Sequence, residues 1–417
     1  MRVLHYIDSL SASVGGPARF VMDAARILTD AGHPSTILTT DPTGSPSSWV
    51  HTNPSRGAFP RVVMAGARSI GNLFFPASQI AEIRRTMSRV DVLHLHNIWG
   101  PADLQLAATA RSIGLPYIIS LHGMLDDWSM TQRGLKKRAF LTLGARHMLE
   151  RAAAVHCTAQ AEFDQSRKWF PKGSVAIVPC AIDLEPYRDL PGSVIAREQF
   201  EFLRNGRPNL LFLSRVHYKK CPEHLIQSAS IMRAQGIDAN IIIAGMGDES
   251  YVASLKAQTQ ALGVDDRVFF PGSVTGQAKY SLYQAADLFV LPTSQENFGL
   301  VLIEAMASGT PVVTTRGTDI WRDIQASGGG EIVDHDPIQL ASRLSQLLRD
   351  EPRRRAMGTA ARQWAMTTFD ESRISNQFEG MYGECASTRP RFSAPIADRQ
   401  RWEQLCPLVP ARGLAMA

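Results

Sequence analysis

The chain has 417 residues, too many for one ordinary hydrophobic core, so at least two domains are expected. Hydrophobic residues make up 44% of the sequence and charged residues 20%, which indicates a soluble globular protein and excludes wholesale disorder. A formal net charge of +5 suits an anionic ligand or surface but is too small to indicate nucleic acid as a partner.

The first residues, Met1–Asp8, are apolar only briefly, which predicts a buried strand and not a secretory signal. No apolar run approaches the roughly 18–20 residues of a membrane-spanning helix. The five cysteines fit no zinc spacing and are an odd number, so buried thiols are expected and not a disulfide framework. Together these features predict a cytoplasmic protein.

In the first half of the chain, β-rich runs alternate with helix-length segments, a pattern typical of βαβ units on a parallel sheet. It predicts an α/β domain over residues 1–185. The predicted strands are Arg2–Asp8, Ser35–Thr40, Asp91–His96, Pro116–Leu121, Ala153–Thr158 and Val175–Pro179. The predicted helices are Ala18–Ala31, Ala77–Arg89, Ala102–Ile113 and Leu135–Arg151.

The same alternation starts again and predicts a second doubly wound domain over residues 205–368. The Pro- and Gly-rich stretch Asp183–Pro208 is expected to be the linker, and Asp370–Glu384 a last helix followed by a tail, 387–417. The predicted strands here are Asn209–Ser214, Ala239–Ala244, Arg267–Phe270, Asp287–Leu291 and Pro311–Thr315. The predicted helices are Glu223–Gln235, Tyr251–Leu262, Gly276–Ala285 and Leu300–Ser308, with more helix after Gln339.

The segment Glu296–Glu304 carries the strongest signal, because it follows a strand and opens a helix. Gly299 allows close backbone approach, and the unpaired N–H groups of a first helical turn suit a phosphate. Carboxylates beside a phosphate make sense if Glu296 and Glu304 bind neutral hydroxyls, as on sugar rings. The alternative is that Glu296 caps the helix and Glu304 is a solvated helix residue.

Two cations follow the strand Asn209–Ser214 in the same domain. Arg215 and Lys220 lie where a parallel sheet presents its ligand-binding edge. A guanidinium can bind two phosphate oxygens and an ammonium acts as a point charge, so we expect an anion site here. The alternative is a basic surface loop.

Two weaker signals lie in the first domain. Gly15 and Gly16 separate the first strand from the first helix and would let an anion approach the helix start closely. His122 ends the strand Pro116–Leu121, where it could donate to a substrate hydroxyl or transfer a proton. The alternative for His122 is a bond to the backbone.

His94 and His96 alternate along one strand, so both rings are expected on the same face of the sheet. Such a pair could bind a metal, but no third ligand has a suitable spacing, and no metal site is predicted.

The segment Arg133–Arg151 contains six basic residues and one acidic residue, Glu150, with interspersed apolar side chains. A basic amphipathic helix of this kind can lie on an anionic membrane surface. The alternative is a solvated helix face packed on the sheet.

The spacings Arg215-x4-Lys220 and Glu296-x7-Glu304 resemble those of retaining glycosyltransferases of the large group 1 family (family 4). The resemblance extends to about Glu384, and the segment Leu282–Thr293 continuing into Glu304–Val313 is highly specific. It implies the α/β GT-B fold, two Rossmann-like doubly wound domains facing across a deep cleft. Residues 1–185 would bind the acceptor, 205–368 the nucleotide-sugar, and the helix 370–386 would cross back to the first domain.

The resemblance also implies a role for each motif residue. Arg215 and Lys220 would bind the diphosphate and neutralise the leaving group, Glu296 would contact the sugar, and Glu304 would hold the ribose hydroxyls. His122 would lie near the anomeric carbon and would count, with Arg215, Lys220 and Glu296, as catalytic. The implied donor-binding residues are Gly15, Gly16, Arg215, Lys220, Val274, Glu296, Phe298, Gly299, Leu300 and Glu304.

The family pattern has Gly after the motif lysine, where this chain has Cys221; this puts the tightness of the helix start in doubt but leaves the cations in place. No metal or other cofactor is expected, since the nucleotide-sugar is a substrate. The implied activity is sugar transfer to a glycan or lipid-linked glycan in bacterial surface polysaccharide synthesis, at the inner face of the cell membrane if the basic helix binds there. The alternatives are a synthase with a small soluble acceptor and a non-catalytic sugar-nucleotide-binding protein.

Overall fold

The computed structural model describes residues 1–50, 59–68 and 73–387, which form two compact units. Unit 1 contains residues 1–182 and the helix that begins at Glu371; unit 2 contains Asp183–Asp370. The predicted tail lies, beyond Ser387, outside the described residues. Within the described part of the chain, no helix combines the length and the apolar character needed to span a bilayer.

Unit 1 is built on a seven-stranded parallel sheet with the order β3-β2-β1-β4-β5-β6-β7. The predicted strands of this half are confirmed to within two residues, and β3 is a further strand at the edge. The strands are β1 Val3–Tyr6, β2 Ser35–Thr39, β3 Arg61–Met64, β4 Val92–Leu95, β5 Tyr117–Ser120, β6 Ala154–Cys157 and β7 Val175–Ile177.

The predicted helix Leu135–Arg151 is wrong as a single element. It is divided into α6, a five-residue π-helical segment (Leu141–Ala145) and α7, because Gly144 departs from helical geometry with φ 162° and ψ −26°. The helices of unit 1 are α1 Gly16–Asp30, α2 Ser47–Val50, α3 Ala77–Met87, α4 Pro101–Ser112, α5 Asp127–Thr131, α6 Gly134–Phe140, α7 Arg146–Glu150, α8 Gln160–Ser166 and α17 Glu371–Ser387, with 3-10 turns at Ala12–Val14 and Arg167–Trp169.

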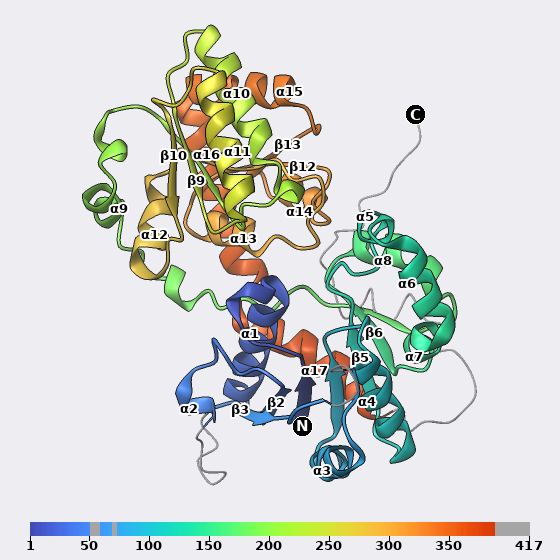
Figure 1. Cartoon of the computed structure of the whole chain (residues 1–417). Helices are drawn as coiled ribbons and strands as arrows, with labels where there is room; N and C mark the ends of the chain where they lie inside the picture. Colours follow the sequence, from blue (N-terminus) through green and yellow to red (C-terminus); the bar gives the residue numbers. More distant parts are fainter. Residues whose placement is uncertain (51–58, 69–72, 388–417) are drawn as a thin grey trace, which may run out of the picture. The chain divides into compact units, whose positions relative to one another are not determined.

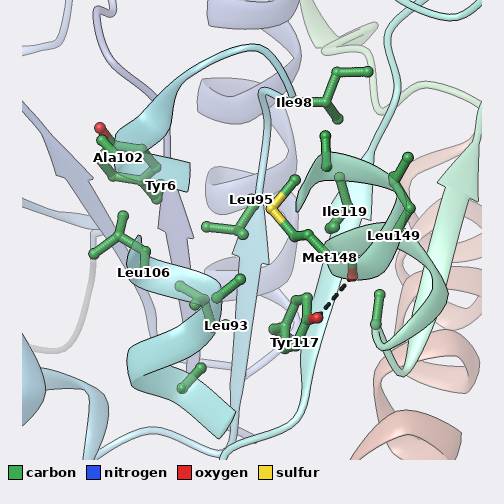
Figure 2. Close-up of a cluster of buried hydrophobic side chains, with 14 of the residues drawn as sticks. Tyr6, Leu93, Leu95, Ile98, Ala102, Leu106, Tyr117, Ile119, Met148 and Leu149 are labelled. Atoms are coloured by element: carbon green, nitrogen blue, oxygen red, sulfur yellow. Dashed lines mark hydrogen bonds between the residues drawn. The ribbon is translucent and has the colours of Figure 1, made fainter. Parts of the chain in front are cut away.

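Side chains alternate across the sheet of unit 1, so each strand contributes to two different cores. Figure 2 shows the apolar one, where the Tyr117 hydroxyl donates to the Met148 carbonyl at 2.7 Å. Burial of such side chains is the main stabilising term of the fold. The labelled members, all at most 2% exposed, are Tyr6, Leu93, Leu95, Ile98, Ala102, Leu106, Tyr117, Ile119, Met148 and Leu149.

The opposite face of the same strands carries imidazoles. His5 on β1 is in register with His94 on β4, and Ser120 on β5 with His156 on β6. All four are fully buried. Helices α1 and α17 contact each other (Figure 1). Helix α17 also contacts β4, and its Tyr382 hydroxyl donates to His94 Nδ1 at 2.7 Å. This polar layer anchors the last helix of unit 1.

Unit 2 is built on a six-stranded parallel sheet with the order β10-β9-β8-β11-β12-β13. The five predicted strands are confirmed, and β13 is a further edge strand that the sequence pattern did not reveal. The strands are β8 Asn209–Leu213, β9 Asn240–Ala244, β10 Val268–Gly272, β11 Leu288–Leu291, β12 Val312–Thr315 and β13 Gly330–Val333.

The stretch expected to be a linker contains a helix, α9, and belongs to unit 2. Its Ala196 N–H donates to Ser281 Oγ at 2.9 Å on α12, so this segment is packed onto the domain. The helices of unit 2 are α9 Val194–Gln199, α10 Pro222–Ala234, α11 Glu249–Ala261, α12 Gly276–Ala285, α13 Leu300–Ala307, α14 Trp321–Ala326, α15 Pro337–Arg349 and α16 Glu351–Thr368, with 3-10 turns at Glu185–Tyr187, Glu201–Arg204 and Tyr218–Lys220.

Candidate active site

The strand order of unit 2 reverses direction between β8 and β11, which are hydrogen-bonded neighbours. Open parallel sheets bind ligands at such a switch point, outside the carboxyl ends of the strands. The loops that begin there are Ser214–Lys220 after β8 and Pro292–Gly299 after β11. The two strongest sequence motifs therefore meet for a topological reason.

Hydrogen bonds to a main-chain carbonyl join these two loops. The Lys219 carbonyl accepts from the Ser294 N–H at 3.0 Å, from the Ser294 hydroxyl at 3.0 Å and from the Thr293 hydroxyl at 3.0 Å. Gly245 allows a neighbouring loop to approach, since a Cβ atom there would lie 1.8 Å from the Ser214 carbonyl oxygen. The site is thus held by main-chain contacts that do not depend on the motif side chains.

The Lys220 ammonium forms an ion pair with the Glu296 carboxylate. The side chains are 9% and 18% exposed, so solvent screens this pair only weakly. Burial raises the pKa of Glu296, but the charge and hydrogen bond of Lys220, with smaller contributions from Lys219 and Arg215, outweigh it and hold the pKa below its usual range. Glu296 is therefore ionised at neutral pH.

Gly299 precedes α13 with φ 77° and ψ 58°, a left-handed conformation that favours glycine. A Cβ there would also lie 2.8 Å from Leu302 Cδ1 and 3.1 Å from Glu296 Cγ. Phe298 is buried and packs edge-to-face on Phe369, with ring centroids 5.7 Å apart. The first amides of α13, those of Leu300 and Val301, therefore follow a rigid turn next to the Lys220–Glu296 pair.

Glu304 lies inside α13 and is 8% exposed, which contradicts the alternative of a solvated helix residue. Its Oε1 accepts from Lys279 Nζ at 2.7 Å and its Oε2 from the Tyr283 hydroxyl at 2.9 Å. Sequence reasoning missed Lys279 and Tyr283. Their spacing of four residues on the predicted helix Gly276–Ala285 was the available signal, since it places both on one face.

Arg215 lies at the end of β8 with an exposed side chain, and it makes no ion pair or hydrogen bond within the described residues. Val274 is buried just after β10. Whereas Lys220 already pairs with Glu296, the Arg215 side chain is open to an incoming anion.

Cys221 occupies the position between Lys220 and α10 with φ 51° and ψ 48°. This left-handed conformation explains why glycine is usual there, and it costs a residue with a side chain roughly 1 kcal/mol or more. The thiol is buried and contacts the Tyr218 carbonyl oxygen at 3.1 Å and His335 Nε2 at 3.1 Å. The helix therefore starts in the geometry that a glycine would give.

The first-domain candidates belong to unit 1. Gly15 has φ 85° and precedes α1, and a Cβ atom on Gly16 would meet nothing within 4 Å, so the start of α1 is open. His122 follows β5 with φ 49°, and the N–H of Gly123 donates to Glu162 Oε1 at 2.6 Å. Nε2 of the His122 ring lies 3.2 Å from Nδ1 of His96.

The expectation that His94 and His96 have no third partner is wrong. His5, 89 residues earlier than His94 in the chain but adjacent to it in the sheet, brings a third imidazole, with ligand atoms of the three within 4.8 Å. Both nitrogens of His94 are hydrogen bonded, to Tyr382 at 2.7 Å and to Ser120 at 2.8 Å. In this structure the buried imidazoles on this face of the sheet therefore belong to a hydrogen-bond network.

Two family models match the chain. Glycosyl transferases group 1 matches residues 195–364, and the Glycosyl transferase 4-like domain matches residues 15–181. The chain therefore belongs to the group 1 (family 4) glycosyltransferases, a family of enzymes of class EC 2.4.

Similar curated proteins are D-inositol 3-phosphate glycosyltransferases. The protein of Corynebacterium diphtheriae is 35% identical over 182 residues, 42% of each chain. That of Thermobispora bispora is 27% identical over 375 residues, 84% of this chain and 86% of the relative. The match thus spans less than half the length of the first of these relatives and most of the other.

Solved structures show the same fold. Anabaena HepE in complex with UDP and glucose has a TM-score of 0.74 at 20% identity, covering 92% of this chain and 99% of that one. WaaG, a glycosyltransferase involved in lipopolysaccharide biosynthesis, has a TM-score of 0.67 at 19% identity, covering 91% and 99%. With its two parallel sheets flanked by helices, the chain has the GT-B fold.

Proposed function

We propose that this chain is a retaining glycosyltransferase that moves a sugar from a nucleotide-diphosphate sugar to a glycan acceptor in bacterial surface polysaccharide synthesis. The observation that carries the proposal is the Lys220–Glu296 ion pair beside the start of α13, with Glu304 buried inside the same helix. Cations suit a diphosphate, and ionised carboxylates suit the hydroxyls of a sugar and a ribose.

In this proposal Arg215, Lys220 and the first amides of α13 bind the diphosphate. When the anomeric carbon–oxygen bond breaks, its electron pair goes to the diphosphate, and these groups stabilise the developing charge. The acceptor hydroxyl forms the new bond on the same face and gives its proton to a leaving phosphate oxygen. Glu296 then orients the sugar, and no step requires a metal or another cofactor.

A lipid-linked acceptor is favoured by the surface around α6. Leu135 and Leu143 are 84% and 83% exposed, which is unusual for leucine. Exposed cations flank them at Arg133, Lys136, Arg138 and Arg146. We propose that this surface contacts the anionic inner face of a membrane, where both kinds of side chain gain free energy.

Flotation with vesicles of phosphatidylglycerol and phosphatidylcholine tests the membrane contact. The double variant Leu135→Ser with Leu143→Ser should stay at the bottom of the gradient while the parent floats. Ile338→Ser, which removes an aliphatic side chain that is 66% exposed on unit 2, is the matched control. A parent that fails to float with these vesicles would exclude the membrane contact.

A small soluble acceptor is the second candidate, because the curated relatives are named for transfer to D-inositol 3-phosphate. In that case the same sugar-donor site would serve a phosphorylated polyol. Product analysis with both acceptor types, at equal concentration, separates the two candidates.

Nucleoside diphosphate release from a panel of nucleotide-sugars tests the activity itself. Lys220→Ala should lower turnover by about a hundredfold or more, because one charge that stabilises the leaving group is lost. Lys256→Ala, an exposed lysine on α11, should leave it unchanged. Turnover that survives Lys220→Ala would count against the proposed site, and binding without turnover would favour a sugar-nucleotide sensor.

A further inference from the structure

The loop after β5 holds His122 in a conformation that a non-glycine residue rarely adopts, with φ 49°. The carboxylate of Glu162, fully buried on α8, fixes this loop from behind. It accepts the Gly123 N–H at 2.6 Å and the Thr158 N–H at 2.6 Å. A strained backbone secured by a buried charge indicates that the position of the His122 ring matters.

The ring of His122 is the outer member of a row of three imidazoles. His122 Nε2 lies 3.2 Å from His96 Nδ1, and His96 Nε2 lies 3.0 Å from His5 Nδ1. Both pairs are stacked, with interplanar angles of 26°. Within the described residues His122 Nδ1 makes no hydrogen bond, so it is the nitrogen left for a ligand.

At the inner end of the row, the described residues offer no group that could accept a proton from His5. His5 Nε2 is buried and without a hydrogen-bond partner in the described part of the chain. A proton accepted by His122 could move inward only by leaving a positive charge on a buried ring. Burial also lowers the pKa of His5 and of His122 to about 3, and that of His96 well below its ordinary value. The three rings therefore stay neutral at physiological pH.

A second row of hydrogen bonds runs alongside and does not include His122. His156 Nε2 must donate to the Val178 carbonyl, 2.8 Å away, because a carbonyl only accepts. Since His156 is neutral, its Nδ1 then accepts from Ser120, which accepts from His94 Nε2–H, while Tyr382 donates to His94 Nδ1. Every proton in this row is assigned, which makes it a suitable internal control.

We propose that His96, which is itself hydrogen bonded to His5, is a positioning residue for His122. It occupies Nε2 of His122, so that the neutral His122 ring presents only its own Nδ1 to the sugar donor. His122 then acts as a hydrogen-bond partner and not as a general base. The identity of the ligand rests on the proposed function, whereas the state of the ring can be measured without any ligand.

Two variants of His96 separate its two hydrogen bonds. In His96→Asn the amide takes the place of Nδ1 and keeps the bond to His122, whichever partner donates. In His96→Gln the amide reaches the place of Nε2 and keeps the bond to His5, so His122 loses its partner. His156→Gln, in the second row, is the matched control of equal burial.

The test is NMR of the full chain labelled with ¹³C and ¹⁵N in histidine, with the His122 signals assigned by His122→Phe. We expect a single tautomer of His122, with Nε2 hydrogen bonded, in the parent, in His96→Asn and in His156→Gln. The His122 signals of these three proteins should not titrate between about pH 5.5 and 8. His96→Gln should show mixed tautomers or a titration in that range. Mixed tautomers in the parent, or an unchanged His122 in His96→Gln, would overturn the proposal.

Sugar-donor turnover completes the test. Loss of the His96–His122 bond should lower kcat about tenfold in His96→Gln, with a smaller change in KM, while His96→Asn stays near the parent. An equal loss in His156→Gln would indicate a merely structural effect and overturn the proposal. If neither the parent nor any variant turns over a nucleotide-sugar, the proposed function fails. If the NMR result holds nevertheless, the positioning role of His96 stands.

Discussion

Cys221 shows how one residue can keep a backbone geometry at a local cost. Its left-handed conformation, φ 51°, is strained for any residue with a Cβ atom. The sequence shows the departure from glycine, but it cannot show that the backbone keeps the glycine conformation.

We expect Cys221→Gly to be more stable than Cys221→Ala by about 1 kcal/mol. Both variants lose the thiol contacts with Tyr218 and His335, and only glycine relieves the strain. Urea denaturation of the two variants measures the difference. Equal stability would mean that the loop relaxes around the alanine.

Glu304 provides a second prediction at this scale. Replacing its carboxylate in Glu304→Gln should weaken the binding of a bare nucleotide such as UDP about tenfold or more, because a hydrogen bond to a charged acceptor is stronger than one to a neutral acceptor. Calorimetry with UDP or GDP measures this.

Glu296→Gln is the natural comparison, since Glu296 is proposed to contact the sugar. It should lower turnover of the nucleotide-sugar more than it changes affinity for the bare nucleotide. If Glu304→Gln binds the nucleotide as well as the parent does, Glu304 does not hold the ribose.

At the scale of elements, α17 makes a buried polar contact with the sheet of unit 1. The Tyr382 hydroxyl, fully buried, donates to His94 Nδ1 and starts the row that ends at Val178. Removing it leaves a buried ring nitrogen without a partner, which costs about 1–3 kcal/mol.

Tyr382→Phe should therefore lower the hydrogen-exchange protection of α17 while leaving that of α16 unchanged. Exchange measured by mass spectrometry resolves the two helices. Equal loss in both helices would show that α17 does not open separately from the rest of the chain.

The longer, strongly periodic elements could be predicted from the sequence, and the edge elements could not. The strand β3 has four residues with alternating exposure and lacks the buried run that marks the central strands. Likewise α9 was hidden by the prolines and glycines around it, although its packing on α12 makes it part of unit 2.

For the candidate site, local motifs predicted Arg215, Lys220, Glu296, Gly299 and Glu304, but the partners of these side chains and of His94 come from long-range pairing. Lys279 and Tyr283 share one face of a predicted helix, but their role as partners of Glu304 follows from the packing of α13 on α12. His5 joins His94 only because β1 and β4 are neighbours, and single-sequence periodicity does not determine which strands pair.

At the scale of the molecule, the buried imidazoles make unit 1 sensitive to acid. The pKa of His5 and His122 is lowered by burial to about 3 and that of His156 to about 4, and those of His94 and His96 are lowered too. In the unfolded chain each would take up a proton below about pH 6.5. The unfolded state then binds more protons, so the free energy of unfolding falls as the pH falls from about 6.5 toward 4.

Each such histidine contributes up to about 1.4 kcal/mol per pH unit in that window. Asp103 acts in the opposite direction, because burial raises its pKa. In unit 2, His217 and His224 also have lowered pKa values, but both are only partly buried.

We therefore expect unit 1 to unfold at a higher pH than unit 2 on acidification. Calorimetry at pH 7, 6 and 5, with brief proteolysis to assign each transition to a unit, measures this. A single transition that shifts as a whole, or a transition of unit 2 that shifts first, would contradict it.

The path of the chain also has a consequence for biosynthesis. Unit 1 is interrupted at Ile182 and is completed only by α17, after the whole of unit 2 has been made. While the ribosome translates residues 183–370, the imidazole-lined face of the first sheet lacks the helix that covers it. The nascent protein therefore passes through a stage in which all strands of the first sheet have been made but the helix that completes unit 1 has not, and that stage is the one at which a chaperone would be of most use.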